Sequence, residues 1–122
     1  MRLLLVSFAL VVLTSCLENK SSSVDDFRVG KFKTELEDQD YVSVAVRNDS
    51  IQIESYNGKK DTFEITWLDP FEYVLLKKKP KNLLDSTAFH VKIISLGDDS
   101  YDFKAYYKGS KFQQRGTAFK ID

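Results

Sequence analysis

The chain has 122 residues, a length that suits a single domain, and its 18 basic and 18 acidic residues give a formal net charge of zero. Without a net charge the protein has no global field to gather nucleic acid or anionic lipid, which argues against both as electrostatic partners. Its single cysteine excludes an internal disulfide, so the fold must be stabilised by its hydrophobic core.

Residues 1–15 have the pattern of a secretory signal peptide: Arg2 precedes an apolar run that is shorter than the roughly 20 residues needed to span a bilayer. The segment Leu13-Thr14-Ser15-Cys16 resembles a bacterial lipobox, which consists of an aliphatic residue, two small residues and a cysteine. This resemblance implies that residues 1–15 are removed and that Cys16 receives the lipid anchor. The alternative is an ordinary signal peptide that happens to contain a cysteine.

Residues 16–26 are polar and include three consecutive serines, which predicts a flexible tether between the lipid and a domain spanning residues 27–122. Leu17 follows the cysteine where an aspartate resembles the inner-membrane retention signal of Gram-negative lipoproteins. By that analogy we expect an outer-membrane protein that faces the periplasm, with cell-surface exposure as the alternative.

Alternating residues dominate the chain from Phe27 onward. Val42, Val44 and Val46 share one face of a predicted strand, and Ser43, Ala45 and Arg47 share the other. Ile51 and Ile53 continue the apolar face opposite Gln52 and Glu54. We expect the apolar faces to point into the core.

Turn signals divide the rest of the chain into further short strands. Asn57-Gly58 favours a tight hairpin because both residues tolerate a positive φ, and Asp69-Pro70 ends the next strand. Residues 82–86 could hold a single helical turn, and the last strand is expected to be interrupted at Gly116. About eight strands predict an all-β antiparallel meander, which forms either a small lipocalin-like barrel or a two-sheet sandwich.

Several phrases of the chain resemble a family of short lipoproteins of flavobacteria and related Bacteroidetes. The phrases are Val29-Gly30-Lys31-Phe32-Lys33, residues 47–54, Ile65-Thr66-Trp67, residues 72–75 and residues 91–94. Members have no established function, and some carry a topoisomerase label that the present sequence, with no nucleotide loop and no basic face, does not support. Cysteines often replace Phe71 and Phe103 in that family, and the resemblance implies that these two rings pack together here.

The sequence offers few groups for catalysis. His90 is the single histidine and is expected on the outer face, where it has no cysteine or second base to form a zinc or acid–base site. Acidic residues cluster at 35–40 and 98–102 but lack the ligand order of a calcium loop. We therefore expect no catalytic residue, no cofactor and no metal site, and predict that the protein is not an enzyme.

Two binding functions remain open. In the first, the domain contacts an envelope protein or the membrane surface, with Tyr106 and the lysines Lys77, Lys78 and Lys79 as the candidate contact surface. The alternative role of those lysines is to protect a strand end from edge pairing. In the second, the domain is a lipocalin-like binder of a small apolar ligand. The aromatic residues that could line its cavity are Tyr56, Trp67, Tyr73, Tyr101, Tyr106 and Tyr107.

Overall fold

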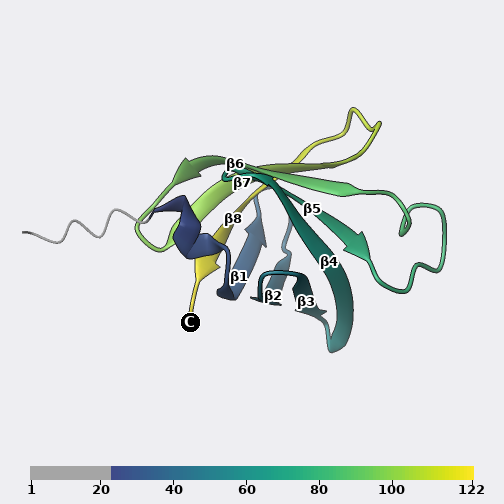
Figure 1. Ribbon diagram of the computed structural model, residues 1–122, viewed down its shortest axis with the longest axis horizontal. Helices are drawn as coiled ribbons and strands as arrows, with labels where there is room; N and C mark the ends of the chain where they lie inside the picture. Colours follow the sequence, from purple (N-terminus) through teal and green to yellow (C-terminus); the bar gives the residue numbers. More distant parts are fainter. Residues whose placement is uncertain (1–22) are drawn as a thin grey trace, which may run out of the picture.

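The computed structural model describes residues 23–122, so the predicted signal peptide, Cys16 and most of the predicted tether lie outside the described residues. Eight antiparallel strands follow one another in chain order, and β1 pairs with β8 to close a barrel (Figure 1). The strands are β1 (Gly30–Leu36), β2 (Val42–Arg47), β3 (Ile51–Tyr56), β4 (Lys59–Asp69), β5 (Glu72–Lys77), β6 (Phe89–Leu96), β7 (Ser100–Tyr107) and β8 (Gln114–Lys120). The all-β prediction is confirmed, and of the two predicted architectures the chain adopts the barrel.

Local turn chemistry places the hairpins where the sequence predicted them. Asn57 and Gly58 join β3 to β4 with φ values of 48° and 76°, the left-handed geometry of a tight hairpin turn. The Asp69 side chain stabilises the turn before β5 by accepting a hydrogen bond from the amide of Phe71 at 2.7 Å. Residues 82–87 form one hydrogen-bonded turn, in which the amide of Ser86 donates to the carbonyl of Leu83 at 3.1 Å.

A short 3-10 helix, η1 (Val24–Phe27), covers one end of the barrel. Its N-terminus is a capping box, in which the Ser23 hydroxyl accepts from the amide of Asp25 and the Asp26 carboxylate accepts from the amide of Ser23. The ring of Phe27 is 1% exposed and belongs to the core. Residues 24–26, which the sequence assigns to the end of the tether, form the first three residues of this helix.

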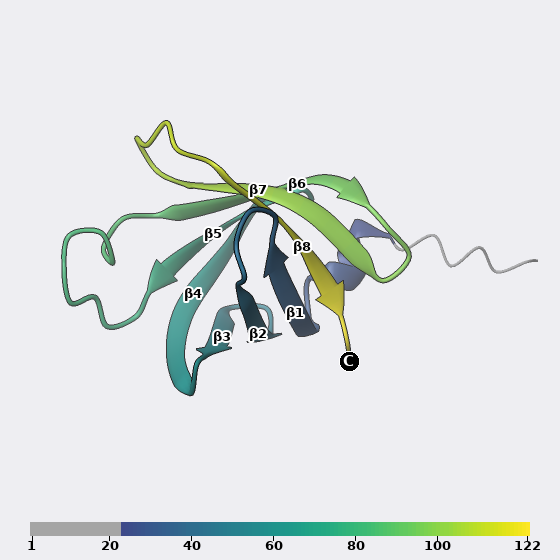
Figure 2. The same ribbon diagram turned by 180° about the vertical axis from the view of Figure 1, so that it is seen from behind.

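The two ends of the described chain meet at this covered end (Figures 1 and 2). The amide of Lys31 donates to the carbonyl of Asp122 at 2.9 Å, and the Lys120 ammonium donates to the carbonyl of Asp26 at 2.6 Å. We call this the closed end. The opposite, open end carries the β1–β2 and β3–β4 hairpins, the long loop between β5 and β6, and the loop between β7 and β8.

Aromatic rings fill the closed half of the barrel. Phe27 and Phe32 each make an edge contact with Tyr101, with ring centroids 5.1 and 6.2 Å apart. Such contacts add about 0.5–1.5 kcal/mol each beyond the burial of the rings. The other buried members of the core are Ile65, Tyr73, Leu75, Val91, Ile93, Phe103, Ala105 and Ala118.

The expected orientation of β2 and β3 is wrong. Val42, Val46 and Ile53 are 49%, 52% and 39% exposed on the outer surface. The opposite faces, with Ser43, Arg47 and Gln52, are buried inside the barrel. Alternation determines which residues share a face, but the face that points inward depends on whether the buried polar groups find partners.

Two further expectations are corrected at Phe103. Strand β8 runs without interruption through Gly116. A Cβ atom at this position would lie 2.5 Å from the carbonyl oxygen of Glu35 and 2.8 Å from the Phe103 ring. Glycine permits this close approach of β8 to β1. The implied packing of Phe71 on Phe103 is also wrong: Phe71 is 46% exposed in a turn, whereas Phe103 lies in the core with Tyr101 as its ring neighbour.

Candidate ligand-binding cavity

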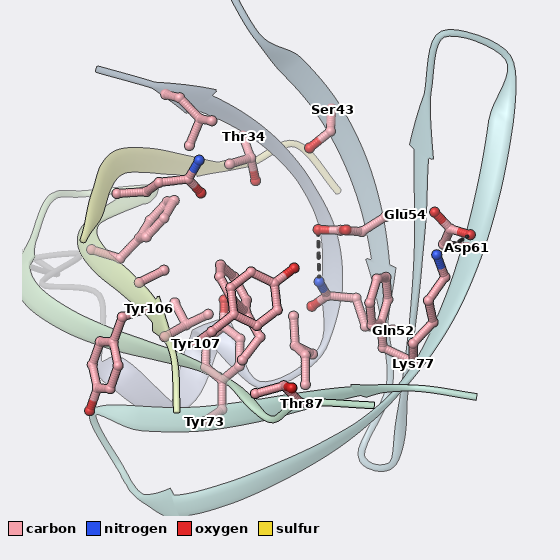
Figure 3. Close-up of a pocket in the computed structure, with 18 of the residues that line it drawn as sticks. Thr34, Ser43, Gln52, Glu54, Asp61, Tyr73, Lys77, Thr87, Tyr106 and Tyr107 are labelled. Atoms are coloured by element: carbon pink, nitrogen blue, oxygen red, sulfur yellow. Dashed lines mark hydrogen bonds and ion pairs between the residues drawn. The ribbon is translucent and has the colours of Figure 1, made fainter. Parts of the chain in front are cut away.

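The open half of the barrel contains a cavity of about 420 Å³ (Figure 3). Its volume falls in the range of small-molecule sites, which is about 300–1,000 Å³. One wall is apolar and is formed by Phe63, Leu75, Phe89, Val91, Phe103 and Ala105. The polar part of the lining, which we call the polar wall, comes from β2 to β5 and consists of Ser43, Gln52, Glu54, Asp61 and Lys77. The cavity is therefore amphipathic.

Arg47 forms the floor of the cavity and is almost completely buried. Its Nε donates to the side-chain oxygen of Gln52 at 2.8 Å, and its Nη1 donates to the carbonyl of Phe27 at 2.7 Å. Its Nη2 donates to the hydroxyls of Tyr73 and Tyr101, both at 3.0 Å. These bonds fasten the closed end, including η1, to the base of the cavity.

Aromatic rings also contact the Arg47 guanidinium, whose central carbon lies 4.4 Å from the ring centroid of Phe32 and 4.6 Å from that of Tyr73. Burial acts to lower the pKa of Arg47, but the adjacent tyrosines outweigh it and raise that pKa, so the group stays charged. Burial raises the pKa of Tyr73 well above its ordinary value, which keeps this hydroxyl neutral. The floor of the cavity is therefore the charged Arg47 guanidinium, which is held by hydrogen bonds to uncharged acceptors and by contacts with aromatic rings.

Glu54 projects from β3 into the cavity, where Gln52 Nε2 donates to its carboxylate at 3.3 Å (Figure 3). Burial is the main cause of its raised pKa; the neighbouring Asp61 adds to the rise and Arg47 opposes it. Within residues 23–122, no cationic nitrogen lies within 4.0 Å of this carboxylate. Glu54 is thus a partly buried carboxylate without an ion-pair partner.

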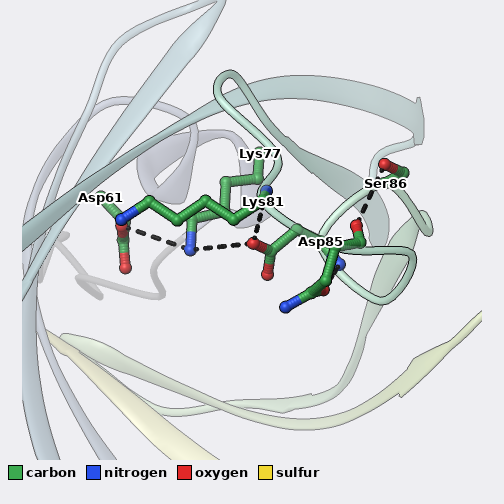
Figure 4. Close-up of polar contacts among 6 residues, drawn as sticks. Asp61, Lys77, Lys81, Asp85 and Ser86 are labelled. Atoms are coloured by element: carbon green, nitrogen blue, oxygen red, sulfur yellow. Dashed lines mark hydrogen bonds and ion pairs between the residues drawn. The ribbon is translucent and has the colours of Figure 1, made fainter.

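Lys77 bridges two carboxylates at the rim of the cavity (Figure 4). Its ammonium lies 3.4 Å from Asp61 and 3.6 Å from Asp85. Burial acts to lower the pKa of Lys77, but hydrogen bonding and attraction to Asp61 and Asp85 outweigh it and raise that pKa. Asp85 is itself fixed, since it accepts from the backbone amide of Lys81 at 3.0 Å. The loop between β5 and β6 is thereby attached to the rim.

Ser43 contributes a buried hydroxyl to the polar wall (Figure 3). Its oxygen makes no hydrogen bond to any of the residues that the structure describes. Burial raises the pKa of the Tyr41 phenol, and its interaction with the Ser43 side chain opposes this rise. A buried polar atom without a hydrogen-bond partner costs free energy, and the Ser43 hydroxyl is able to form a hydrogen bond with a ligand group.

The structure separates the residues of the predicted contact surface. Lys77 points into the rim of the cavity, whereas Lys78 and Lys79 are exposed in the loop that follows β5. Tyr106 points away from the cavity centre in Figure 3, and its ring stacks on His90 at a centroid distance of 5.2 Å. Nδ1 of His90 in turn lies 3.0 Å from the Glu72 carboxylate. Cys16 lies outside the described residues.

The aromatic residues proposed as cavity lining take four different positions. Tyr73, Tyr106 and Tyr107 contact the cavity, and Tyr101 lies beneath it in the floor. Tyr56 stacks on Tyr41 at a centroid distance of 4.4 Å. Trp67 packs near the closed end against Arg28, whose guanidinium carbon lies 4.9 Å from the ring centroid.

Sequence reasoning missed the polar wall. The alternation predicts that Ser43, Arg47, Gln52 and Glu54 lie on the strand faces that point away from the core. These residues alternate with valine and isoleucine in the sequence, but the alternation does not determine whether the polar or the apolar residues point inward. Among residues 23–122 no group of three or more histidine, cysteine or acidic side chains is arranged to hold a metal ion, and no helix has the length and hydropathy of a membrane span.

Comparisons with known proteins leave the site to be interpreted from its own geometry. No family model matches the chain, and no curated protein is significantly similar to its sequence. No solved structure matches it significantly either.

Proposed function

We propose that the protein binds a small amphipathic molecule in the open half of its barrel. The observation that carries this proposal is the orientation of β2 and β3, which place Ser43, Gln52 and Glu54 against an open cavity and leave valines on the surface. Burying polar groups while exposing apolar ones opposes stability. A ligand that forms hydrogen bonds with the inward polar groups would explain why they are buried despite this cost in stability.

The two walls specify the kind of ligand. A purely apolar molecule would fit against Leu75, Val91 and Phe103 but would leave the polar wall without partners. A molecule with one polar end and an apolar body satisfies both walls. The ligand class proposed here is therefore amphipathic, a refinement of the small apolar ligand that the sequence suggested.

We also propose that the barrel is a lipoprotein held in the outer membrane by lipid on Cys16 and facing the periplasm. The described chain begins at Ser23, at the closed end, only a few residues after this cysteine. An anchor there would attach the barrel to the membrane through its closed end, opposite the mouth of the cavity. We propose that the barrel binds its ligand without catalysing a reaction.

Titration with 1-octanol, followed by nuclear magnetic resonance, tests the binding proposal. We expect the largest chemical-shift changes at Leu75, Val91 and Phe103, and saturation at one equivalent. Ala105→Trp should abolish these changes, because Ala105 is buried in the apolar wall and the larger ring would occupy the cavity. Lys104→Trp, which adds the same ring on the neighbouring outward-facing position of β7, is the control.

Shifts confined to the outer surface, or shifts that persist in the Ala105→Trp protein, would contradict the proposal. Thr34→Trp, on β1, provides a second blocking variant two strands away from Ala105, should Ala105→Trp fail to fold. Thermal unfolding of each variant establishes that it is folded before the titration.

A second candidate function is docking of an envelope protein on the outer face of β2 and β3. The observation that favours it is the row of exposed apolar side chains at Val42, Val46 and Ile53, of which Val46 and Ile53 are direct cross-strand partners. Val46→Lys should weaken such docking without changing 1-octanol binding. An unchanged complex in the Val46→Lys protein would remove this candidate.

A further inference from the structure

We infer that the ligand of the cavity is an organic cation, a protonated amine whose nitrogen binds Glu54 and whose apolar body lies along the apolar wall. This inference rests on the proposed binding function and adds the charge of the ligand. Its basis is an imbalance of charge and hydrogen bonding in the open half of the barrel.

Glu54 has acceptor capacity that the protein does not use. A carboxylate offers about four acceptor positions. One contact is present, the 3.3 Å bond from the Gln52 amide. A donor from the ligand would occupy the remaining positions, and a charged donor would form the stronger bond.

The charges around the cavity favour a cation. Its charged lining residues are Arg47 and Lys77 on the positive side and Glu54, Asp61 and Asp85 on the negative side, an excess of one negative charge. Lys77 is shared between Asp61 and Asp85, so its charge is already compensated. Glu54 and Asp61 are direct cross-strand partners, and like charges in that relationship repel each other. A bound ammonium would remove both the excess and the repulsion.

The positive charge of Arg47 is not available to an anionic ligand. Four of its five N–H donors are used by Gln52, Phe27, Tyr73 and Tyr101. An anion that reached the floor would also pass Glu54. Lys77 is likewise fixed between two carboxylates at the rim. The positive groups of the cavity are thus structural, and the group with spare capacity is negative.

Independent features around Glu54 suit an ammonium group. The buried Ser43 hydroxyl, which has no partner among residues 23–122, lies on β2 next to β3 and can accept a second N–H. The rings of Phe89 and Tyr107, 4.8 Å apart, also line the cavity, and the apolar body of the ligand would pack against them. Leu75 and Val91 continue the apolar wall on which the rest of the ligand would lie.

Calorimetric titration with three probes of equal chain length tests the inference. The probes are n-octylammonium, 1-octanol and octanoate at about pH 7, so that the end group is the variable. We expect n-octylammonium to bind roughly 10-fold more tightly than 1-octanol, as for one charge-assisted hydrogen bond. Octanoate should bind most weakly, because it meets Glu54.

Glu54→Gln should reduce the ratio of n-octylammonium to 1-octanol affinity to about one. Glu64→Gln makes the same change on the exposed outer face of β4 and should leave the ratio unchanged. Equal binding of n-octylammonium and 1-octanol, preferential binding of octanoate, or an unchanged ratio in Glu54→Gln would overturn the inference while leaving small-molecule binding intact. No binding of any probe would overturn both.

Discussion

Glu54 on β3 and Asp61 on β4 are directly opposed across the two strands, and both side chains line the cavity. Asp61 has Lys77 as its ion-pair partner, whereas Glu54 has none within residues 23–122. The open half of the barrel thus holds a destabilising pair of like charges. The closed half holds the Arg47 guanidinium, which uses four of its five N–H donors in hydrogen bonds. This contrast leads to separate predictions for the two halves.

Glu54 should make stability fall as the pH rises. Because its folded-state pKa is raised above the ordinary value of 4.5, the folded protein keeps this proton at pH values where the unfolded chain has lost it. The free energy of unfolding therefore decreases as the pH rises from that ordinary value through the raised one. The stability of Glu54→Gln relative to the parent should therefore grow as the pH is raised above 4.5, as measured by urea unfolding.

Asp61→Asn supplies the control for this pH dependence. Asp61 contributes to the raised pKa of Glu54, so its neutralisation should narrow the pH interval in which stability is lost. Burial is the larger cause, and part of the dependence should remain. A stability difference between Glu54→Gln and the parent that is constant with pH would contradict this assignment.

Arg47→Met should destabilise the protein by about 3–5 kcal/mol, the range for removing one partner of a buried charged network. The substitution would leave the Phe27 carbonyl and the Gln52 side chain without their donor, and would remove the guanidinium from between two aromatic rings. Denaturant unfolding measures the loss. Arg115→Met, at an exposed position of β8, should change stability by no more than about 0.5 kcal/mol.

Gly116→Ala should destabilise the barrel by about 1–3 kcal/mol, because the added methyl group would force β8 away from β1. Phe103→Leu removes the ring atom that lies 2.8 Å from the new methyl group. In a double-mutant cycle the cost of Gly116→Ala should therefore be smaller in the Phe103→Leu background. Simple additivity of the two costs would show that the ring contact does not contribute.

Cys16→Ala tests the proposed anchor. Metabolic labelling with a radioactive fatty acid should mark the parent protein and not the variant, since the thiol is the acceptor in the lipobox interpretation. The variant should also be lost from the membrane fraction or remain unprocessed. Unchanged membrane association of Cys16→Ala would contradict the lipoprotein assignment.

The number of strands and several of the turns between them were predictable because their signals are local. Strict alternation identifies strands, and residues such as Asn57 and Gly58 identify the turns between them. The capping box from Ser23 to Asp26 was also present in the sequence, but its single turn is too short to give a helical periodicity. Barrel closure, by contrast, depends on pairing of β1 with β8, which are distant in the chain.

The sequence predicted three of the tyrosines that contact the cavity, Tyr73, Tyr106 and Tyr107, but the polar wall was not predictable for a physical reason. Placing Arg47 inside the barrel is acceptable because four partners converge on it, and these lie 5 to 54 positions away in the chain. A short stretch of sequence around β2 does not include most of these partners. The pattern of β2 by itself predicts that its valines belong to the core. They lie on the outer face instead, because Arg47 occupies the inner one.

A crystal structure of the protein grown with 1-octanol tests ligand binding most directly. We predict electron density for the alkyl chain inside the open half, within about 4.0–4.5 Å of Leu75, Val91 and Phe103. The hydroxyl should lie at hydrogen-bond distance from Glu54, roughly 2.5–3.0 Å. Density for 1-octanol on the outer valines, with an unoccupied barrel, would contradict the proposed function.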